Sequence, residues 1–350
     1  MAGGMRVTVA LPSAGPLVAA LEDTGATVVI CPSPVLRKSI LKPRGFALFS
    51  AQIATGTASG LRVLRNCNPD VVYINTLTIP LWFVLAKLFR KPVLTHVHEA
   101  EGSAPKILQI LLSAPLLLST SIVANSAYSA SVLAEAVHCL SARTVVVYNG
   151  VPGPNQPDAA RKAIASSVRL LYIGRLSSRK GVDVAISALS HIKQHGQDAS
   201  LDIVGAVFPG YEGYEQELRG LVVKLGLQDF VTFHGFAPNV WPHIARADVV
   251  LVPSRLDEPF GNTAVEAVLA GRPVIVSDTS GLREAAGGYA SAQLVAPGDA
   301  QALAQAVERV VDNWTGYRDH AQIDATKALT KHGPEAYGAR ISAEVRAVLP

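Results

Sequence analysis

The segment Glu258-Pro-Phe-Gly-Asn-Thr-Ala-Val-Glu-Ala-Val-Leu-Ala-Gly-Arg-Pro273 decides how this chain is interpreted. Residues 247–254 precede it as a compact apolar run that closes on Pro-Ser, which predicts a short buried strand. A helix is predicted to begin near Asn262 or Thr263, because either residue can cap a helix. The segment therefore places one carboxylate, Glu258, on the loop after a strand and a second, Glu266, in the first turn of a helix.

The two carboxylates allow two interpretations. Thr263 and Glu266 have the spacing of a capping box, which would explain Glu266 without a ligand, and Glu258 would then be a solvated loop acid. Alternatively, both carboxylates accept hydrogen bonds from sugar diols, while the amides of residues 260–262 at a helix N-terminus favour phosphate oxygens. These residues alone leave both interpretations open.

Length and composition indicate a globular protein of two domains. The 350 residues exceed one ordinary core, and a content of 49% hydrophobic and 17% charged residues disfavours wholesale disorder. Three scattered cysteines, Cys31, Cys67 and Cys139, indicate buried thiols in a reducing compartment rather than a disulfide framework or a metal site. No signal peptide is apparent, so a cytoplasmic protein is expected.

The positive charge gathers in the first part of the chain. Residues 1–150 hold twelve Lys or Arg against six Asp or Glu. Much of this excess lies within residues 35–65, where Arg37, Lys38, Arg44 and others alternate with apolar residues such as Phe46. Such a segment can rest on the anionic inner face of a plasma membrane, or it can be a solvated loop followed by a core helix. Nucleic acid is not an expected partner, because no recognition motif is present.

The longest uncharged stretch, Ile107 to Ser126, is about as long as a membrane span. Pro115 and the polar residues 119–121 argue instead for a buried helix followed by a strand at 121–124. The prediction is therefore a chain without a transmembrane helix in this stretch.

The first half alternates strands with helices, and its candidate ligand contacts lie where strands end. Gly15 lies in the first strand-to-helix turn, where a backbone can approach a ligand closely. The strand at 91–99 ends in His96, His98 and Glu99. These three groups could suggest zinc, but no third histidine is nearby, and a structural histidine is the alternative for each imidazole.

A second alternation begins after a stretch dense in Pro and Gly, residues 152–158, which predicts an interdomain hinge. The strand at 168–173 leads into Gly174-Arg-Leu-Ser-Ser-Arg-Lys-Gly181 and then an amphipathic helix. Arg175 and Lys180 thus lie at the carboxyl end of a parallel strand, where open α/β sheets bind ligands. Two fixed cations there could neutralise a leaving diphosphate, whereas Arg179 is interpreted as a charged surface residue.

The pattern Glu-Pro-Phe-Gly-x4-Glu-Ala-x3-Gly-x-Pro-Val-Ile, together with Gly-Arg-Leu-x3-Lys-Gly, resembles the signature of retaining glycosyltransferase family 4. The resemblance implies the α/β GT-B fold, in which two doubly wound Rossmann-like domains face each other across a cleft. It implies an acceptor-side domain at residues 1–152, a nucleotide-sugar-binding domain at 153–325, and a C-terminal helix at 326–350 that crosses back to the first domain.

The resemblance also implies roles for individual residues. Glu266 would hold the ribose hydroxyls, Glu258 and the amides of residues 260–262 the sugar hydroxyls, and Arg175 with Lys180 the diphosphate. The residues assigned to catalysis are Glu258, His98, Arg175 and Lys180, and those assigned to the donor are Gly15, Gly174, Arg175, Lys180, Glu258, Phe260, Gly261, Asn262, Thr263 and Glu266.

The implied activity is transfer of a sugar from a UDP- or GDP-sugar to an acceptor hydroxyl with retention of anomeric configuration. His98 would support the sugar by its position, through its carbonyl. No cofactor or metal is expected, and no Asp-x-Asp triplet occurs. The expected acceptor is a glycan or a lipid-linked intermediate of polysaccharide synthesis. A non-hydrolysing sugar-nucleotide epimerase and a catalytically idle binding subunit of the same fold are the alternatives.

Overall fold

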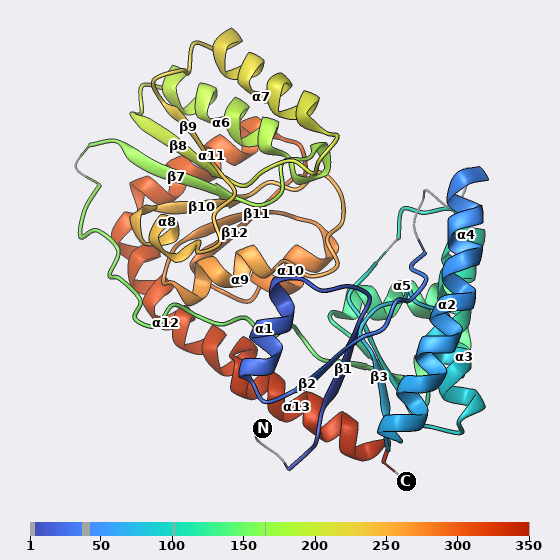
Figure 1. Cartoon of the computed structure of the whole chain (residues 1–350). Coiled ribbons are helices and arrows are strands. Elements are labelled where there is room, and N and C mark those ends of the chain that lie inside the picture. Colours follow the sequence, from blue (N-terminus) through green and yellow to red (C-terminus); the bar gives the residue numbers. More distant parts are fainter. Residues whose placement is uncertain (1–3, 37–42, 101, 165, 350) are drawn as a thin grey trace. The chain divides into compact units, whose positions relative to one another are not determined.

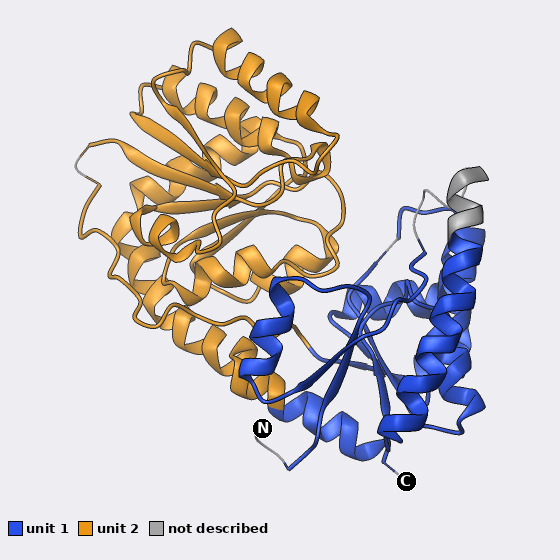
Figure 2. Ribbon diagram, in the orientation of Figure 1, with its two compact units in different colours: residues 1–147, 339–350 blue, residues 148–338 orange. Residues whose placement is uncertain are grey.

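The computed structural model describes residues 4–36, 43–100, 102–164 and 166–349 (Figure 1). The chain divides into two compact units, residues 1–147 with 339–350, and residues 148–338 (Figure 2). Every strand pair in both units is parallel, and helices connect the strands. Each unit is therefore an α/β unit of crossover connections, as the alternating sequence pattern predicts.

The first unit contains a four-stranded sheet in the order β3-β4-β5-β6 and a separate pair, β1-β2. Its strands are β1 (Thr8–Leu11), β2 (Thr27–Ile30), β3 (Val72–Ile74), β4 (Val93–Val97), β5 (Ser121–Ala124) and β6 (Thr144–Val146). Its helices are α1 (Pro16–Asp23), α2 (Pro43–Cys67), α3 (Leu81–Leu88), α4 (Lys106–Ser113), η2 (Ala114–Leu118), α5 (Ala127–Ala136) and η3 (His138–Arg143). Every residue of β4 is buried, as is usual for a central parallel strand.

The second unit contains one six-stranded sheet in the order β12-β11-β10-β7-β8-β9. Its strands are β7 (Val168–Ile173), β8 (Ala199–Val204), β9 (Val231–Gly235), β10 (Val249–Val252), β11 (Val274–Ser277) and β12 (Ala292–Val295). Its helices are η4 (Ser178–Lys180), α6 (Val182–Gln194), α7 (Glu212–Lys224), α8 (Trp241–Arg246), α9 (Asn262–Leu269), α10 (Ser280–Ala286), α11 (Ala300–Asp312) and α12 (Trp314–His332). Helix α13 (Pro334–Ala347) begins in this unit and ends in the first.

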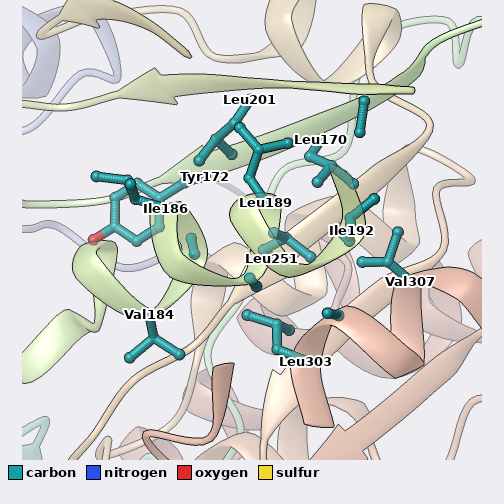
Figure 3. Close-up of a cluster of buried hydrophobic side chains, with 14 of the residues drawn as sticks. Leu170, Tyr172, Val184, Ile186, Leu189, Ile192, Leu201, Leu251, Leu303 and Val307 are labelled. Carbon is teal, nitrogen blue, oxygen red and sulfur yellow. The ribbon is translucent and has the colours of Figure 1, made fainter. Parts of the chain in front are cut away.

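One face of this sheet is covered by α6 and α11. Ile186, Leu189 and Ile192 of α6 lie over Leu170 of β7 and Leu201 of β8 in a buried cluster (Figure 3). All five side chains are at most 1% exposed, so their burial fixes α6 firmly on the sheet. The loop that leads from β7 into α6 therefore starts and ends on rigid elements.

The strand order reverses beside β7. From β7 the chain proceeds outward through β8 to β9, and from β10, on the other side of β7, outward through β11 to β12. The carboxyl ends of β7 and β10 are thus neighbours at the switch point, where open parallel sheets form ligand crevices. The loops that follow these two strands contain both sequence motifs.

Two details of the predicted elements are wrong. Helix α9 starts at Asn262 with Gly261 as its N-cap and has no side-chain cap, so Glu266 lies in the second turn and forms no capping box with Thr263. The stretch from Ile107 does form a helix followed by a strand, but α4 is not buried: Ile107 is 74% exposed. Within the described ranges, no helix is both long and apolar enough to cross a bilayer.

The basic, apolar segment predicted for residues 35–65 can be followed only in part. Residues 37–42, with Arg37 and Lys38, lie outside the described residues. Helix α2 begins at Pro43 and ends at Cys67, so the later portion of the segment is helical.

Candidate functional site

The loops after β7 and β10 are in backbone contact with each other. Gly181, the N-cap of α6, has a φ of 67°, a conformation that favours glycine. A Cβ atom at this position would lie 1.9 Å from the carbonyl oxygen of Pro253, at the end of β10. Only glycine permits this approach, which brings Lys180 to the β10 loop.

Lys180 and Glu258 form an ion pair across the two loops. The Lys180 Nζ lies 2.8 Å from the Glu258 carboxylate, and the hydroxyl of Ser254 donates to the same carboxylate at 2.7 Å. The side chain of Glu258 is 12% exposed and that of Lys180 is 35% exposed. Because the pair is only partly screened by water, it fixes both charges at the edge of the sheet more strongly than a surface pair would.

Arg175 lies on the same loop but outside this pair. Its guanidinium stacks over the ring of Phe208, with 3.8 Å from Cζ to the ring centroid. Its carbonyl accepts a hydrogen bond of 2.9 Å from the hydroxyl of Tyr172, and burial raises the pKa of that hydroxyl, which keeps it a donor. Arg175 forms no ion pair among the described residues, so its charge is fixed in place and available to an anion.

Helix α9 begins with unpaired backbone donors rather than with a side-chain cap. Gly261 has a φ of 137°, and a Cβ there would lie 2.6 Å from Leu282 Cδ2, so glycine is required. Within the described part of the chain, the amides of Phe260, Gly261 and Asn262 donate to no acceptor. Three amides at a helix N-terminus form a site that favours a phosphate or carboxylate oxygen.

Glu266 is half-buried on α9 between buried neighbours such as Val265 and Ala267. Burial raises the pKa of its carboxyl. Its carboxylate forms no hydrogen bond or ion pair with any described residue. A half-buried carboxylate without a partner costs folding free energy, and such residues are typical of binding sites.

Two residues that the sequence did not single out support this loop. The Tyr148 ring stacks on Phe260 with 5.5 Å between centroids, and the Asn149 Nδ2 donates to the Asn262 Oδ1 at 2.9 Å. Both belong to the segment where the chain enters the second unit. The only hint in the sequence is that both residues lie just before the hinge predicted at residues 152–158, because neither residue belongs to either motif.

The remaining predicted residues lie in the first unit. Gly15 is the N-cap of α1, in extended backbone, and a Cβ there would meet no atom within 4 Å. The His98 Nε2 lies 2.8 Å from the Asn75 Oδ1, and the carbonyl of His98 lies 3.5 Å from the Asn125 Nδ2. These contacts fix the orientation of His98 at the end of β4.

His96 behaves as a structural histidine. It is fully buried, its Nδ1 lies 2.6 Å from the Tyr73 hydroxyl, and its ring lies 3.9 Å from that of His98 at a tilt of 36°. Burial, and then the neighbouring His98, lower the pKa of His96 to about 3, so it is neutral at pH 7. No group of three or more His, Cys, Asp or Glu within the described ranges is placed to hold a metal ion, so the zinc alternative gains no support.

The predicted donor residues Gly174, Arg175, Lys180, Glu258, Phe260, Gly261, Asn262, Thr263 and Glu266 all belong to the second unit, and Gly15 and His98 to the first. Direct contacts connect Lys180 with Glu258, and the backbone links Glu258 through the loop to α9. The second unit by itself therefore presents cations, carboxylates and free amides at one edge of its sheet.

Family models match both halves of the chain. The model described as Glycosyltransferase Family 4 matches residues 2–152, and the model described as Glycosyl transferases group 1 matches residues 158–328. Together they include every predicted site residue, so both halves agree with the resemblance carried by the two motifs.

Related proteins and solved structures also include glycosyltransferases. Glycogen synthase of Mycobacterium tuberculosis is 30% identical over 267 residues, which are 71% of this chain and 62% of that protein. The match thus spans less than two thirds of the synthase. The 2-deoxystreptamine glucosyltransferase of Streptomyces kanamyceticus is 28% identical over 325 residues, 83% of this chain and 80% of the relative.

The crystal structure of HepE from Anabaena, in complex with UDP and glucose, matches this fold with a TM-score of 0.79 at 21% identity, covering 97% of this chain and 91% of HepE. The predicted α/β fold of two Rossmann-like halves is confirmed. The chain belongs to the family 4 glycosyltransferases of the GT-B fold.

Proposed function

We propose that this protein transfers a sugar from a nucleotide-diphosphate sugar to an acceptor hydroxyl, with retention at the anomeric carbon. One observation carries the proposal: Glu266 is a half-buried carboxylate with no partner among the described residues, on a helix whose first amides also lack acceptors. A donor that brings both hydroxyls and phosphates satisfies both sets of groups at once.

Each group has a role in this assignment. Glu266 accepts hydrogen bonds from the ribose hydroxyls, and Glu258, fixed by Lys180 and Ser254, accepts from the sugar hydroxyls. The cations of Arg175 and Lys180 receive the diphosphate oxygens, and the free amides at the start of α9 donate to oxygens of the same donor. Gly174 and Thr263 line the same loops, and Gly174 has a φ of 153° that only glycine adopts readily.

The chemistry requires charge stabilisation more than proton transfer by a side chain. The bond from the anomeric carbon to the phosphate oxygen breaks, and the acceptor oxygen bonds to the same face of that carbon. The acceptor proton moves to a phosphate oxygen of the leaving nucleotide. Negative charge develops on that phosphate, and preorganised groups such as Lys180 and Arg175 stabilise it more in the transition state than in the ground state.

The relatives support a UDP-type donor. HepE is solved with UDP and glucose, and the Streptomyces kanamyceticus relative is named a glucosyltransferase. GDP remains the alternative nucleotide. The reaction as proposed uses no cofactor and no metal, because fixed cations and amides perform the charge stabilisation.

From the first unit we assign Gly15 to the donor and His98 to catalysis, with His98 supporting the sugar through its position. The acceptor is a glycan or a lipid-linked intermediate in cell-envelope polysaccharide synthesis, handled by a cytoplasmic enzyme in peripheral contact with the inner face of the plasma membrane. The charge excess of residues 1–150, twelve basic against six acidic, supports that contact.

Calorimetry with UDP and with GDP, followed by mass spectrometry of the products, tests this function. The full chain is expected to bind one nucleotide and to glycosylate an acceptor from a panel of UDP- and GDP-sugars, polyprenyl-linked acceptors included. Release of free nucleotide without any acceptor would point to an epimerase. Binding of neither nucleotide would point to an idle subunit and contradict the proposal.

A further inference from the structure

Helix α4 of the first unit is inverted, with apolar side chains outside and polar side chains inside. Ile107 is 74% exposed, Leu108 44%, Ile110 42% and Leu111 64%. The buried side chains of the helix are those of Gln109 and Ser113. A helix at the surface of a globular protein normally has the opposite arrangement.

The inversion is fixed by hydrogen bonds. The Gln109 Nε2 donates at 2.9 Å to the carbonyl of Gly102 and at 2.9 Å to the carbonyl of Ala104. A buried amide whose hydrogen bonds are made is stable, whereas turning it to the surface would leave two carbonyls to be satisfied by other groups. Because these hydrogen bonds hold Gln109 inside, the apolar side chains on the opposite side of α4 face outward.

The apolar surface continues beyond α4 and has cations at both ends. Leu117 of η2, the next element, is 45% exposed. Lys106 begins α4, and the Arg143 guanidinium donates to the carbonyls of Leu117 at 3.3 Å and of Ser119 at 3.2 Å. The sequence of α4 and η2 contains no acidic residue. We call Ile107, Leu108, Ile110, Leu111 and Leu117, with Lys106 and Arg143, the α4 ridge.

The composition of the α4 ridge fits lipid better than protein. Its exposed apolar residues are all Leu or Ile, whereas the residues that dominate binding at protein interfaces are Trp, Tyr and Arg, with Leu under-represented. A short apolar helix face flanked by Lys and Arg is the arrangement of interfacial helices. Such helices bury their apolar face at the boundary of headgroups and acyl chains while cations meet anionic lipids.

We propose that the α4 ridge docks the protein onto an anionic bilayer surface. Leu and Ile side chains enter the acyl boundary, and Lys106 and Arg143 contact anionic headgroups. The reason for docking rests on the proposed function, because docking would bring the protein to a lipid-linked acceptor. The docking itself does not require donor binding.

Co-sedimentation of the full chain with vesicles tests this surface. Vesicles of phosphatidylcholine with phosphatidylglycerol are compared with vesicles of phosphatidylcholine alone. The wild type is expected to bind the anionic vesicles and to bind the neutral ones at least about tenfold more weakly, with further loss on raising the salt.

Two variants separate the contribution of the apolar side chains to vesicle binding from that of the charged side chains. Ile107→Ser with Leu111→Ser is expected to lower binding to anionic vesicles about tenfold or more, because two apolar side chains no longer enter the lipid. Lys106→Glu keeps a side chain that suits a helix N-terminus, and it should weaken binding to anionic vesicles only. The matched control is Ile323→Ser with Leu329→Ser on α12, two aliphatic side chains that are 55% and 54% exposed.

UDP binding by calorimetry is measured for every variant. If vesicle binding falls while UDP binding stays, the α4 ridge is assigned; if UDP binding is absent throughout, the proposed function fails while the docking result stands. The docking proposal is overturned if wild type binds neither kind of vesicle, or if the Ile107→Ser, Leu111→Ser variant binds like wild type. Light scattering that shows a dimer dissociated by this variant, without vesicle binding, would assign the ridge to a second copy instead.

Discussion

Helices α4 and α9 are both eight residues long, and they bury opposite kinds of side chain. Helix α9 buries Ala, Val and Leu against its sheet, and it keeps Glu266 half-buried without a partner. Helix α4 buries Gln109, whose amide is satisfied by two carbonyls, and exposes four Leu and Ile side chains.

The difference between the two helices shows which side chains indicate a ligand or a binding surface. Gln109 is a polar residue in the interior whose amide donates to two carbonyls of the preceding loop, so it indicates no ligand. Glu266 is not explained by any described neighbour and indicates a polar ligand. The exposed face of α4 has no apolar partner among the described residues and indicates an apolar surface.

The largest effect is expected for Lys180→Ala. This change removes a cation from the developing phosphate charge and leaves Glu258 without its partner, so kcat/KM should fall about 1000-fold. Steady-state kinetics with the best donor measures it. Lys193→Ala is the matched control, since Lys193 pairs with Asp198 in the same unit, and its kcat/KM should stay within about twofold of wild type. Equal losses of kcat/KM in the two variants would contradict the role of Lys180 in catalysis.

Glu266→Gln is expected to have the next largest effect, and it acts in opposite directions on binding and on stability. The change removes the carboxylate that accepts from the ribose, so UDP affinity should fall about 10- to 100-fold. The ligand-free variant should melt no lower than wild type, because a half-buried charge is lost. Calorimetry and thermal unfolding measure the two quantities.

Glu308→Gln is the control for Glu266→Gln, because Glu308 already has a partner in His195 at 2.7 Å. UDP affinity of the control should match wild type. If Glu266→Gln melts well below wild type and binds UDP normally, then Glu266 has a structural role and the comparison with Gln109 is wrong.

A smaller effect is expected at the segment that supports the loop. Asn149→Ala removes the hydrogen bond to Asn262, and Tyr148→Ala removes the stack on Phe260, so each should raise the KM for the donor about three- to tenfold with little change in kcat. Tyr148→Phe keeps the ring and should restore the KM. Gln293→Ala, which loses a hydrogen bond to Ala306 far along the sheet, serves as the control.

The smallest effect is in the pH dependence of stability. Burial raises the pKa of Glu266 above its ordinary value of 4.5, so the folded state binds this proton more strongly than the unfolded state does. The contribution of protonated Glu266 is complete below pH 4.5 and is lost as the pH rises through the raised pKa. The stability of wild type relative to Glu266→Gln should therefore fall across that window in urea unfolding. A flat difference would mean that burial does not affect this carboxyl.

Much of the site could be predicted because the second unit follows local rules. A buried Val-rich run, a Pro-Ser break and an Asn before an apolar period locate β10 and α9 closely. The β7 loop was found for the same reason. The turn occupied by Glu266 was missed because Gly261, at a φ of 137°, takes the N-cap position that Asn262 or Thr263 was expected to hold.

Other features depend on tertiary contacts that no local pattern reveals. Lys180 pairs with Glu258, and Tyr148 stacks on Phe260, so the loop is supported by residues far from it in the sequence. Helix α4 was predicted to be buried because its composition is apolar, but composition does not determine which face Gln109 turns inward. That choice follows from two carbonyls of the preceding loop.

The most direct test of the central claim is amide hydrogen exchange of the full chain with and without UDP. The claim is that the donor occupies the free amides at the start of α9 and the loop after β7. UDP is predicted to slow exchange in residues 258–266 and 174–181, and to leave strand β3 unchanged. Protection confined to other segments, in a sample that calorimetry shows to be saturated with UDP, would contradict the account.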